Sequence, residues 1–189
     1  LAARAQAGAS HHLGDAVAGR CVWFRSFHAR LYAGHWRLYK APMSKSFMDM
    51  ALEEARRAAQ AGEVPVGCVV VRNGQVVARA ANRTLTDRDP TAHAELLAIR
   101  EAARALGTER LTDCDVHVTL EPCAMCAGAI SFARIRRLYY GAPDPKGGAV
   151  DNGVRFFASP ACHHRPEVYA GIGEREAGAL LKDFFRDRR

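Results

Sequence analysis

Four side chains in this sequence have the types and the spacing of a catalytic metal site. His93 and Glu95 lie two positions apart, and Cys123 and Cys126 follow Pro122 in a Cys-x-x-Cys pattern. Zinc binds histidine nitrogen and cysteine thiolate, and a catalytic zinc keeps three protein ligands and one open position. Glu95 would lie about 200° around a helix from His93, so it is poorly placed to bind the same ion. We therefore predict three zinc ligands, His93, Cys123 and Cys126, and a proton-carrying carboxylate, Glu95.

Two other interpretations of the cysteine pair have to be considered. A Cys-x-x-Cys pair can be redox-active, or it can form half of a four-ligand structural zinc site. A redox pair would leave His93 and Glu95 without a role. A structural zinc site would need a second pair, and no such spacing occurs among the remaining cysteines, which are Cys21, Cys68, Cys114 and Cys162. The pattern favours a catalytic zinc site.

Two helix starts are expected to position this site. An Ala- and Leu-rich run over residues 92–106 ends at Gly107, so we predict His93 and Glu95 in the first turn of that helix. Pro122 is typical of a first helical position, which would place the two cysteines at i and i+3 on one face. Unpaired N–H groups at a helix start also favour a thiolate.

The rest of the chain predicts an α/β domain. Apolar residues repeat at helical spacing over 46–61, and the Asn73-Gly74 pair is typical of a β-hairpin. We expect strands at 66–71, 76–80, 116–120 and 137–141, and a closing helix at 173–188. Leu180, Leu181, Phe184 and Phe185 are predicted on the apolar side of that closing helix. This order predicts a three-layer α/β/α fold around a mixed sheet, antiparallel at the hairpin and parallel afterwards.

Charge and composition divide the chain of 189 residues into two parts. The net charge is +7, but residues 1–42 hold six basic residues and one acidic residue and so contribute +5 of it. We expect this Arg-rich segment to be an N-terminal extension that is disordered, is a targeting presequence or precedes the natural start at Met43, and 43–189 to be the zinc-dependent domain. No apolar run is long enough to cross a bilayer and no secretory leader is recognisable, so we expect a soluble, cytoplasmic protein.

Local clusters of charge carry more information than the total. One cluster follows the cysteine helix and contains Arg134, Arg136 and Arg137, and the other ends the chain around Phe184 and Phe185. Each could bind a polyanion or could be an ordinary solvated face. Asn82 follows the second expected strand, and its amide could contact the edge of a nucleobase or could serve in a turn.

The segments around these residues resemble the cytidine-deaminase-like superfamily, and within it the bacterial tRNA-specific adenosine deaminases. The resemblance runs from about Phe47 to Arg189 and is carried by Glu63-Val64-Pro65-Val66-Gly67, Asp89-Pro90-Thr91-Ala92-His93-Ala94-Glu95 and Leu120-Glu121-Pro122-Cys123-Ala124-Met125-Cys126. The Phe-Phe-Arg-x-Arg-Arg ending is its most specific part, since it is not expected in guanine or cytosine deaminases.

The resemblance implies deamination of adenosine to inosine at the wobble position of a tRNA anticodon. It also implies a cytidine-deaminase-like three-layer α/β/α fold with a central mixed five-stranded sheet. One Zn²⁺ per subunit is expected, bound by His93, Cys123 and Cys126, with Glu95 as the proton shuttle, in a homodimer whose subunits both contact the anticodon arm. The substrate-binding residues expected from it are Asn82, Ala94, Asp144, Lys146, Arg186, Arg188 and Arg189.

Two rival functions remain open at this point. A deaminase of free guanine, cytosine or a nucleoside would use the same zinc site, and only the basic clusters argue against it. A non-catalytic RNA-binding module with a structural zinc would have no use for Glu95.

Overall fold

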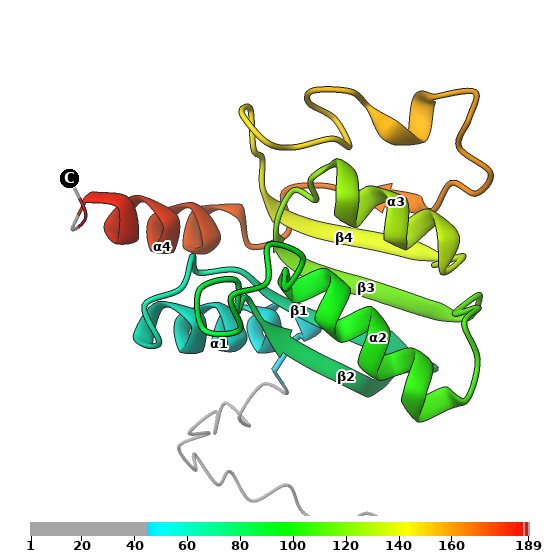
Figure 1. Cartoon of the computed structure of the whole chain (residues 1–189), viewed down its shortest axis with the longest axis horizontal. Coiled ribbons are helices and arrows are strands. Elements are labelled where there is room, and N and C mark those ends of the chain that lie inside the picture. Colours follow the sequence, from blue (N-terminus) through cyan, green and yellow to red (C-terminus); the bar gives the residue numbers. More distant parts are fainter. Residues whose placement is uncertain (1–44, 187, 189) are drawn as a thin grey trace, which may run out of the picture. The chain divides into compact units, whose positions relative to one another are not determined.

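The computed structural model describes residues 45–186 and residue 188, so the expected extension, residues 1–42, lies outside the described residues. The elements follow one another as shown in Figure 1. They are α1 (Phe47–Gln60), β1 (Gly67–Arg72), β2 (Gln75–Ala81), α2 (Ala94–Leu106), β3 (Cys114–Leu120), α3 (Ala124–Phe132), β4 (Arg137–Ala142), the 3₁₀ turn η1 (Phe156–Ala158), β5 (Glu167–Tyr169) and α4 (Glu174–Arg186).

The strands form one mixed sheet in the order β2-β1-β3-β4-β5. The predicted hairpin is confirmed: β1 and β2 pair antiparallel, and both Asn73 and Gly74 adopt the positive φ angles that a tight hairpin turn requires. Strands β3, β4 and β5 are mutually parallel, as expected. The prediction was wrong for one pair, because β3 lies antiparallel beside β1 instead of extending the parallel part. The hairpin leaves β2 at the sheet edge, so the chain returns to the other side of β1.

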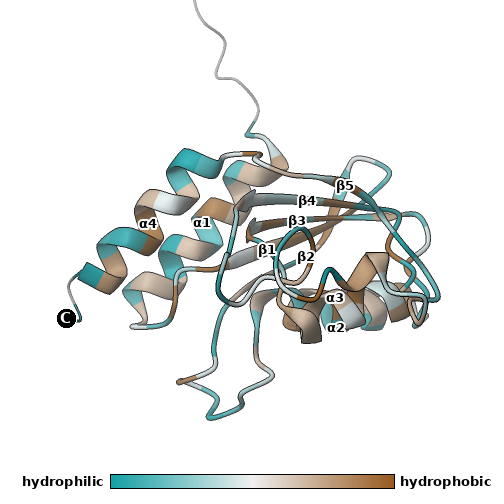
Figure 2. Ribbon diagram, turned by 90° about the horizontal axis from the view of Figure 1, so that it is seen from above, coloured by the Kyte–Doolittle hydropathy of each residue, from teal (hydrophilic) through white to brown (hydrophobic). Residues whose placement is uncertain are grey.

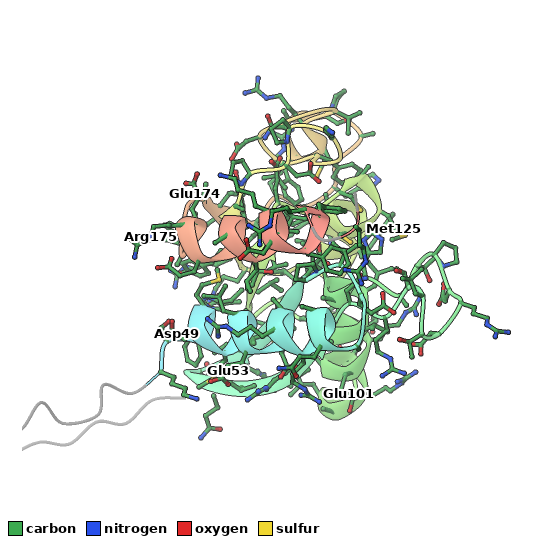
Figure 3. All side chains as sticks on the ribbon, turned by 90° about the vertical axis from the view of Figure 1, so that its left-hand side faces the viewer. Asp49, Glu53, Glu101, Met125, Glu174 and Arg175 are labelled. Carbon is green, nitrogen blue, oxygen red and sulfur yellow. The ribbon has the colours of Figure 1, made fainter. Side chains whose placement is uncertain are left out.

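Helices cover both faces of the sheet, which confirms the three-layer fold (Figure 2). Along β1 the side chains alternate: Cys68 and Val70 belong to the core on the face with α2 and α3, and Val69 and Val71 to the core on the face with α1 and α4. A strand buried on both faces reads as a continuous apolar run, as β1 does. Figure 3 shows the charged side chains of Asp49 on α1 and of Glu174 and Arg175 on α4 at the outside of the domain. Glu54 of α1 is instead buried and pairs with Arg79 of β2.

Helix boundaries follow from local sequence signals. Ser46 caps α1 with a capping box, in which its side chain accepts from the N–H of Asp49 and the Asp49 carboxylate accepts from the N–H of Ser46. Gly107 ends α2 at a φ of 65°, a left-handed conformation that suits glycine. The expected apolar side of α4 was wrong in one residue: Phe184 is buried, whereas Phe185 is 49% exposed.

Strand β5 was missed as a segment in the sequence. It has three residues, all of them exposed, so its pattern carries no apolar alternation. Stacked rings hold it in place: Tyr169 stacks on Tyr139 of β4 at 4.7 Å, and Tyr139 stacks on His117 of β3 at 4.5 Å. Contact across strands, not local sequence, therefore defines this element.

Gly67 lets α1 approach the sheet. A Cβ atom at this position would lie 2.1 Å from the carbonyl oxygen of Ala51 and 2.5 Å from the backbone nitrogen of Ala55. These are backbone atoms of a helix, so they cannot move aside singly.

We predict that Gly67→Ala lowers the free energy of unfolding by about 1–3 kcal/mol, because overpacking displaces α1. Gly178→Ala is the matched control, since a Cβ atom there meets nothing within 4 Å and alanine favours the helix by about 0.5–1 kcal/mol. Chemical denaturation of both variants measures the difference. Equal stabilities of Gly67→Ala and the wild type would contradict the close approach.

Candidate active site

His93 and Glu95 lie at the start of α2, although not quite as predicted. His93 is the N-cap, with the extended backbone angles φ −73° and ψ 148°, and Glu95 is the second residue of the helix. The expectation that His93 lies inside the first turn was therefore wrong by one residue. At the N-cap the side chain is free of helical packing, and His93 makes no side-chain capping hydrogen bond.

Cys123 has the same position on α3. It is the N-cap, with φ −71° and ψ 174°, and it too makes no side-chain capping hydrogen bond. Pro122 therefore precedes the helix instead of opening it, and the two cysteines occupy the N-cap and third helical positions. An isolated bridge between Cys123 and Gly148 fixes this backbone in an extended form, which a first helical position cannot have. The side chains still meet, because an N-cap side chain points toward the third residue of its helix.

The three predicted ligands converge on one point. Cys123 Sγ lies 3.6 Å from Cys126 Sγ and 3.7 Å from His93 Nδ1, and Cys126 Sγ lies 3.5 Å from the same nitrogen. A tetrahedral zinc with Zn–S bonds of about 2.3 Å and Zn–N bonds of about 2.0–2.1 Å sets its ligands roughly 3.6–3.8 Å apart. The donor set thus fits one Zn²⁺. Within the described part of the chain this is the only such group of metal-binding side chains.

The side chains of the site have pKa values that differ from their ordinary ones in opposite directions. A hydrogen bond from Cys126, helped by His93, lowers the pKa of the Cys123 thiol to about 4, whereas the same hydrogen bond and burial raise the pKa of the Cys126 thiol. A hydrogen bond to Cys123 raises the pKa of His93 above its ordinary value. Glu95 is 4% exposed, and its burial raises the pKa of its carboxyl group. A raised pKa brings a carboxyl group closer to the range in which it can both take up and release a proton during a reaction.

Asn82 lies beside this cluster. It follows β2, and the next N–H, that of Arg83, donates to the carbonyl of Ala92 at 3.0 Å, directly before His93. The bond closes the base of loop 83–92 and joins the residue after Asn82 to the residue before His93. Ala94 supplies the first N–H of α2, one of the groups that have no acceptor within a helix.

The structure places four of the remaining predicted residues along a single groove of 1140 Å³. Asp144 and Lys146 line it from the loop after β4, and Arg186 and Arg188 from the end of the chain. Leu181, Lys182 and the exposed Phe185 complete the same wall. We refer to this feature as the basic groove. Arg189 lies outside the described residues.

The other basic cluster is largely neutralised. Arg136 forms a two-pronged ion pair with Asp115, with both distances at 2.9 Å, and Arg137 pairs with Glu167 at 2.8 Å. Arg134 donates to the carbonyl of His163. The acids come from other strands, so the sequence could not show that this cluster is a weak site for a polyanion.

The sequence analysis missed two buried carboxylates beside the site. Glu63 and Glu121 are 0% and 2% exposed, and each accepts hydrogen bonds from a loop. Glu121 binds the N–H groups of Asp144, Val150, Asp151 and Asn152 and the side chain of Asn152. The available signal was an acid close before a proline (Pro65, Pro122) in an otherwise apolar stretch.

Comparison with known proteins identifies the family. Residues 42–142 match the cytidine and deoxycytidylate deaminase zinc-binding region. A tRNA-specific adenosine deaminase of Agrobacterium fabrum is 61% identical over 143 residues, which cover 76% of this chain and 94% of that protein. The chain belongs to this family. A tRNA-specific adenosine deaminase of Bacillus subtilis is 45% identical over 143 residues, 76% of this chain and 89% of that protein.

Solved structures agree with this family membership. A structure from a study of A-to-I editing by tRNA:A34 deaminases at the wobble position of transfer RNA matches with a TM-score of 0.71 and 61% identity, covering 71% of this chain and 98% of that one. A guanine deaminase from Nitrosomonas europaea shares the fold at a TM-score of 0.64, with 26% identity over 73% of this chain and 82% of that one. The fold is therefore common to deaminases of different substrates.

We predict that Cys123→Ser and Cys126→Ser lose bound zinc, because a serine hydroxyl does not replace a thiolate ligand. Glu95→Gln keeps one zinc per chain, because its side chain is not a ligand. Elemental analysis of the dialysed proteins measures this. Full zinc content in either serine variant would show that the site has other ligands.

Proposed function

We propose that this chain hydrolyses adenosine to inosine at the wobble position of a tRNA anticodon, using one bound zinc. The observation that carries the proposal is the cluster of three ligand atoms within 4.8 Å of one another, with the buried Glu95 beside it, in a chain 61% identical to a tRNA-specific adenosine deaminase. His93, Cys123 and Cys126 hold the metal.

The chemistry divides between the metal and Glu95. Zinc, when bound, supplies Lewis-acid activation of water. Glu95 takes a proton from the attacking water and gives it to the ring nitrogen beside the amine-bearing carbon of adenine. It then transfers the second water proton to the leaving amine, so that water and adenosine yield inosine and ammonia. The N–H of Ala94, at the positive end of α2, stabilises the negative charge that develops on oxygen.

A single-stranded RNA loop is the substrate that the surroundings of the site favour. The adenine has to be turned out of its stack to reach the buried Glu95, and this costs least in a loop such as an anticodon. The basic groove offers Lys146, Lys182 and Arg188 for phosphates and the exposed Phe185 for stacking on a base. Arg188 keeps its charge, although it donates to the carbonyl of Gly62 at 3.1 Å and lies over the Phe184 ring. A deaminase of free guanine would have no use for this groove.

We also propose that the active form is a cytoplasmic homodimer. Helix α3 contains no charged residue, yet its last residue, Phe132, is 76% exposed. An interface with a second copy would cover this exposed ring and bury its apolar surface. Among the described residues no helix is long and apolar enough to cross a membrane. Sedimentation analysis measures the oligomeric state.

The function is tested with a tRNA that carries adenosine at the wobble position. We expect the wild-type protein to convert this adenosine, which is read as an A-to-G change in the cDNA, and Glu95→Gln to be roughly 10²–10⁴-fold slower. The same tRNA with guanosine at that position is the control. If the tRNA is unchanged but free guanine releases ammonia, the small-molecule function is correct instead.

The basic groove is tested with the triple substitution of Arg186, Arg188 and Arg189 by alanine, which keeps Phe184 and Phe185. We expect weaker tRNA binding and a salt dependence shallower by roughly 0.7–0.9 log unit per lost phosphate contact. The control replaces Arg56, Arg104 and Arg110, none of which lines the groove. Equal affinity and salt slope in the wild type and the groove variant would show that the groove does not bind tRNA.

A further inference from the structure

A fully buried carboxylate connects α1 to the base-contacting side of the site. Glu63 follows the end of α1, and its own N–H donates to the carbonyl of Ala58 at 2.9 Å, so its backbone is fixed. Its side chain is 0% exposed, although no cation pairs with it in the described part of the chain. A buried charge of this kind is stable only if hydrogen bonds replace its hydration.

These hydrogen bonds come from one segment, residues 82–86. The Glu63 carboxylate accepts from the N–H of Thr86 at 2.7 Å, the N–H of Leu85 at 3.0 Å, the hydroxyl of Thr84 at 3.2 Å and the side-chain amide of Asn82 at 3.2 Å. Burial by itself would raise the pKa of Glu63, but the hydrogen bonds from Thr86 and Leu85 outweigh it and leave the pKa below its ordinary value. The carboxylate is therefore charged at neutral pH.

The network fixes which way the amide of Asn82 faces. The Thr84 hydroxyl gives its one proton to Glu63, so it can only accept from Asn82, and Asn82 Nδ2 lies 3.2 Å from it. Turning the amide over would bring its oxygen against the carboxylate and the hydroxyl lone pairs. Because Asn82 is 6% exposed, it has little room to adopt another rotamer.

We propose that Glu63 is a positioning residue for the deamination: it holds Asn82 and the following loop in the one orientation that receives the everted base. The inference rests on the proposed function and deepens it, because it names the group that sets the geometry of base recognition. In the described part of the chain, the hydrogen-bond partners of Glu63 include no metal ligand, and Glu63 does not line the basic groove. Its effect on deamination therefore passes through Asn82. The hydrogen bond between the N–H of Arg83 and the carbonyl of Ala92 also fixes the end of this loop, directly before His93.

The test is a double-mutant cycle of Glu63→Gln and Asn82→Ala, measured as kcat/KM on the wobble-adenosine tRNA with zinc content recorded for each protein. Glutamine keeps the shape but directs two N–H donors at groups that are donors themselves. We expect Glu63→Gln to lose roughly ten- to a hundredfold in kcat/KM when Asn82 is present, with zinc retained. In the Asn82→Ala background it should change kcat/KM by less than about threefold, since the group it positions is gone.

Glu54→Gln is the matched control. Glu54 is also buried, at 2% exposure, but it pairs with Arg57 and Arg79 and is not among the hydrogen-bond partners of Asn82. The Glu54→Gln substitution should lower the melting temperature, as Glu63→Gln does, and should leave kcat/KM within about twofold of the wild-type value. Should Glu63→Gln fail to fold, Thr84→Val removes the hydroxyl that bridges Glu63 and Asn82 and leaves their direct hydrogen bond, and we expect a smaller loss that also disappears in the Asn82→Ala background.

Two outcomes would overturn the inference. If Glu63→Gln costs the same factor with and without the Asn82 side chain, Glu63 does not act through Asn82. If Glu63→Gln melts earlier but keeps the wild-type kcat/KM, its role is stability alone. Both outcomes require that the wild type deaminates the tRNA, so a failure of the proposed function is seen separately, as an inactive wild type.

Discussion

The convergence of two helix starts on one metal is the constraint on which the rest of this structure depends. Three ligand atoms have to lie within 4.8 Å of one another, although His93 and Cys123 are 30 residues apart in the chain. Both are N-cap residues, which combine an extended backbone with a side chain that lies over the N-terminal end of the helix. Ligation takes the place of capping, and the positive helix ends favour the thiolates.

The sheet brings those two helix starts together. Strand β1 pairs with both β2 and β3, so the ends of β2 and β3, from which the chain passes to α2 and α3, lie on either side of it. The hairpin thus determines the distance between the helices. Gly67, at the start of β1, lets α1 pack closely on the face of the sheet opposite to α2 and α3. The sheet is thereby covered on both faces.

Two buried carboxylates fix the loops on either side of the metal ligands. Glu63 holds residues 82–86 and Glu121 holds residues 144–152, and each satisfies its charge with N–H groups instead of a cation. A loop fixed by several hydrogen bonds to one charged group loses little further entropy when it binds a ligand. These anchors fix the conformation of the two loops, 82–86 and 144–152, although neither loop is part of regular secondary structure.

The sequence by itself determined the chemistry of the site and the architecture of the domain. The tertiary structure decided which side chains are available for that chemistry. His93, Glu95, Cys123 and Cys126 could be recognised because ligand type and spacing are local, and the α/β/α order followed from local periodicity and turn signals. The exact N-caps, the short strand β5 and the exposed side of Phe185 depend on contacts across strands and layers. So do the ion pairs that neutralise Arg136 and Arg137 and the bonds that bury Glu63 and Glu121. Burial and pairing are properties of partners distant in sequence, and no local pattern encodes them.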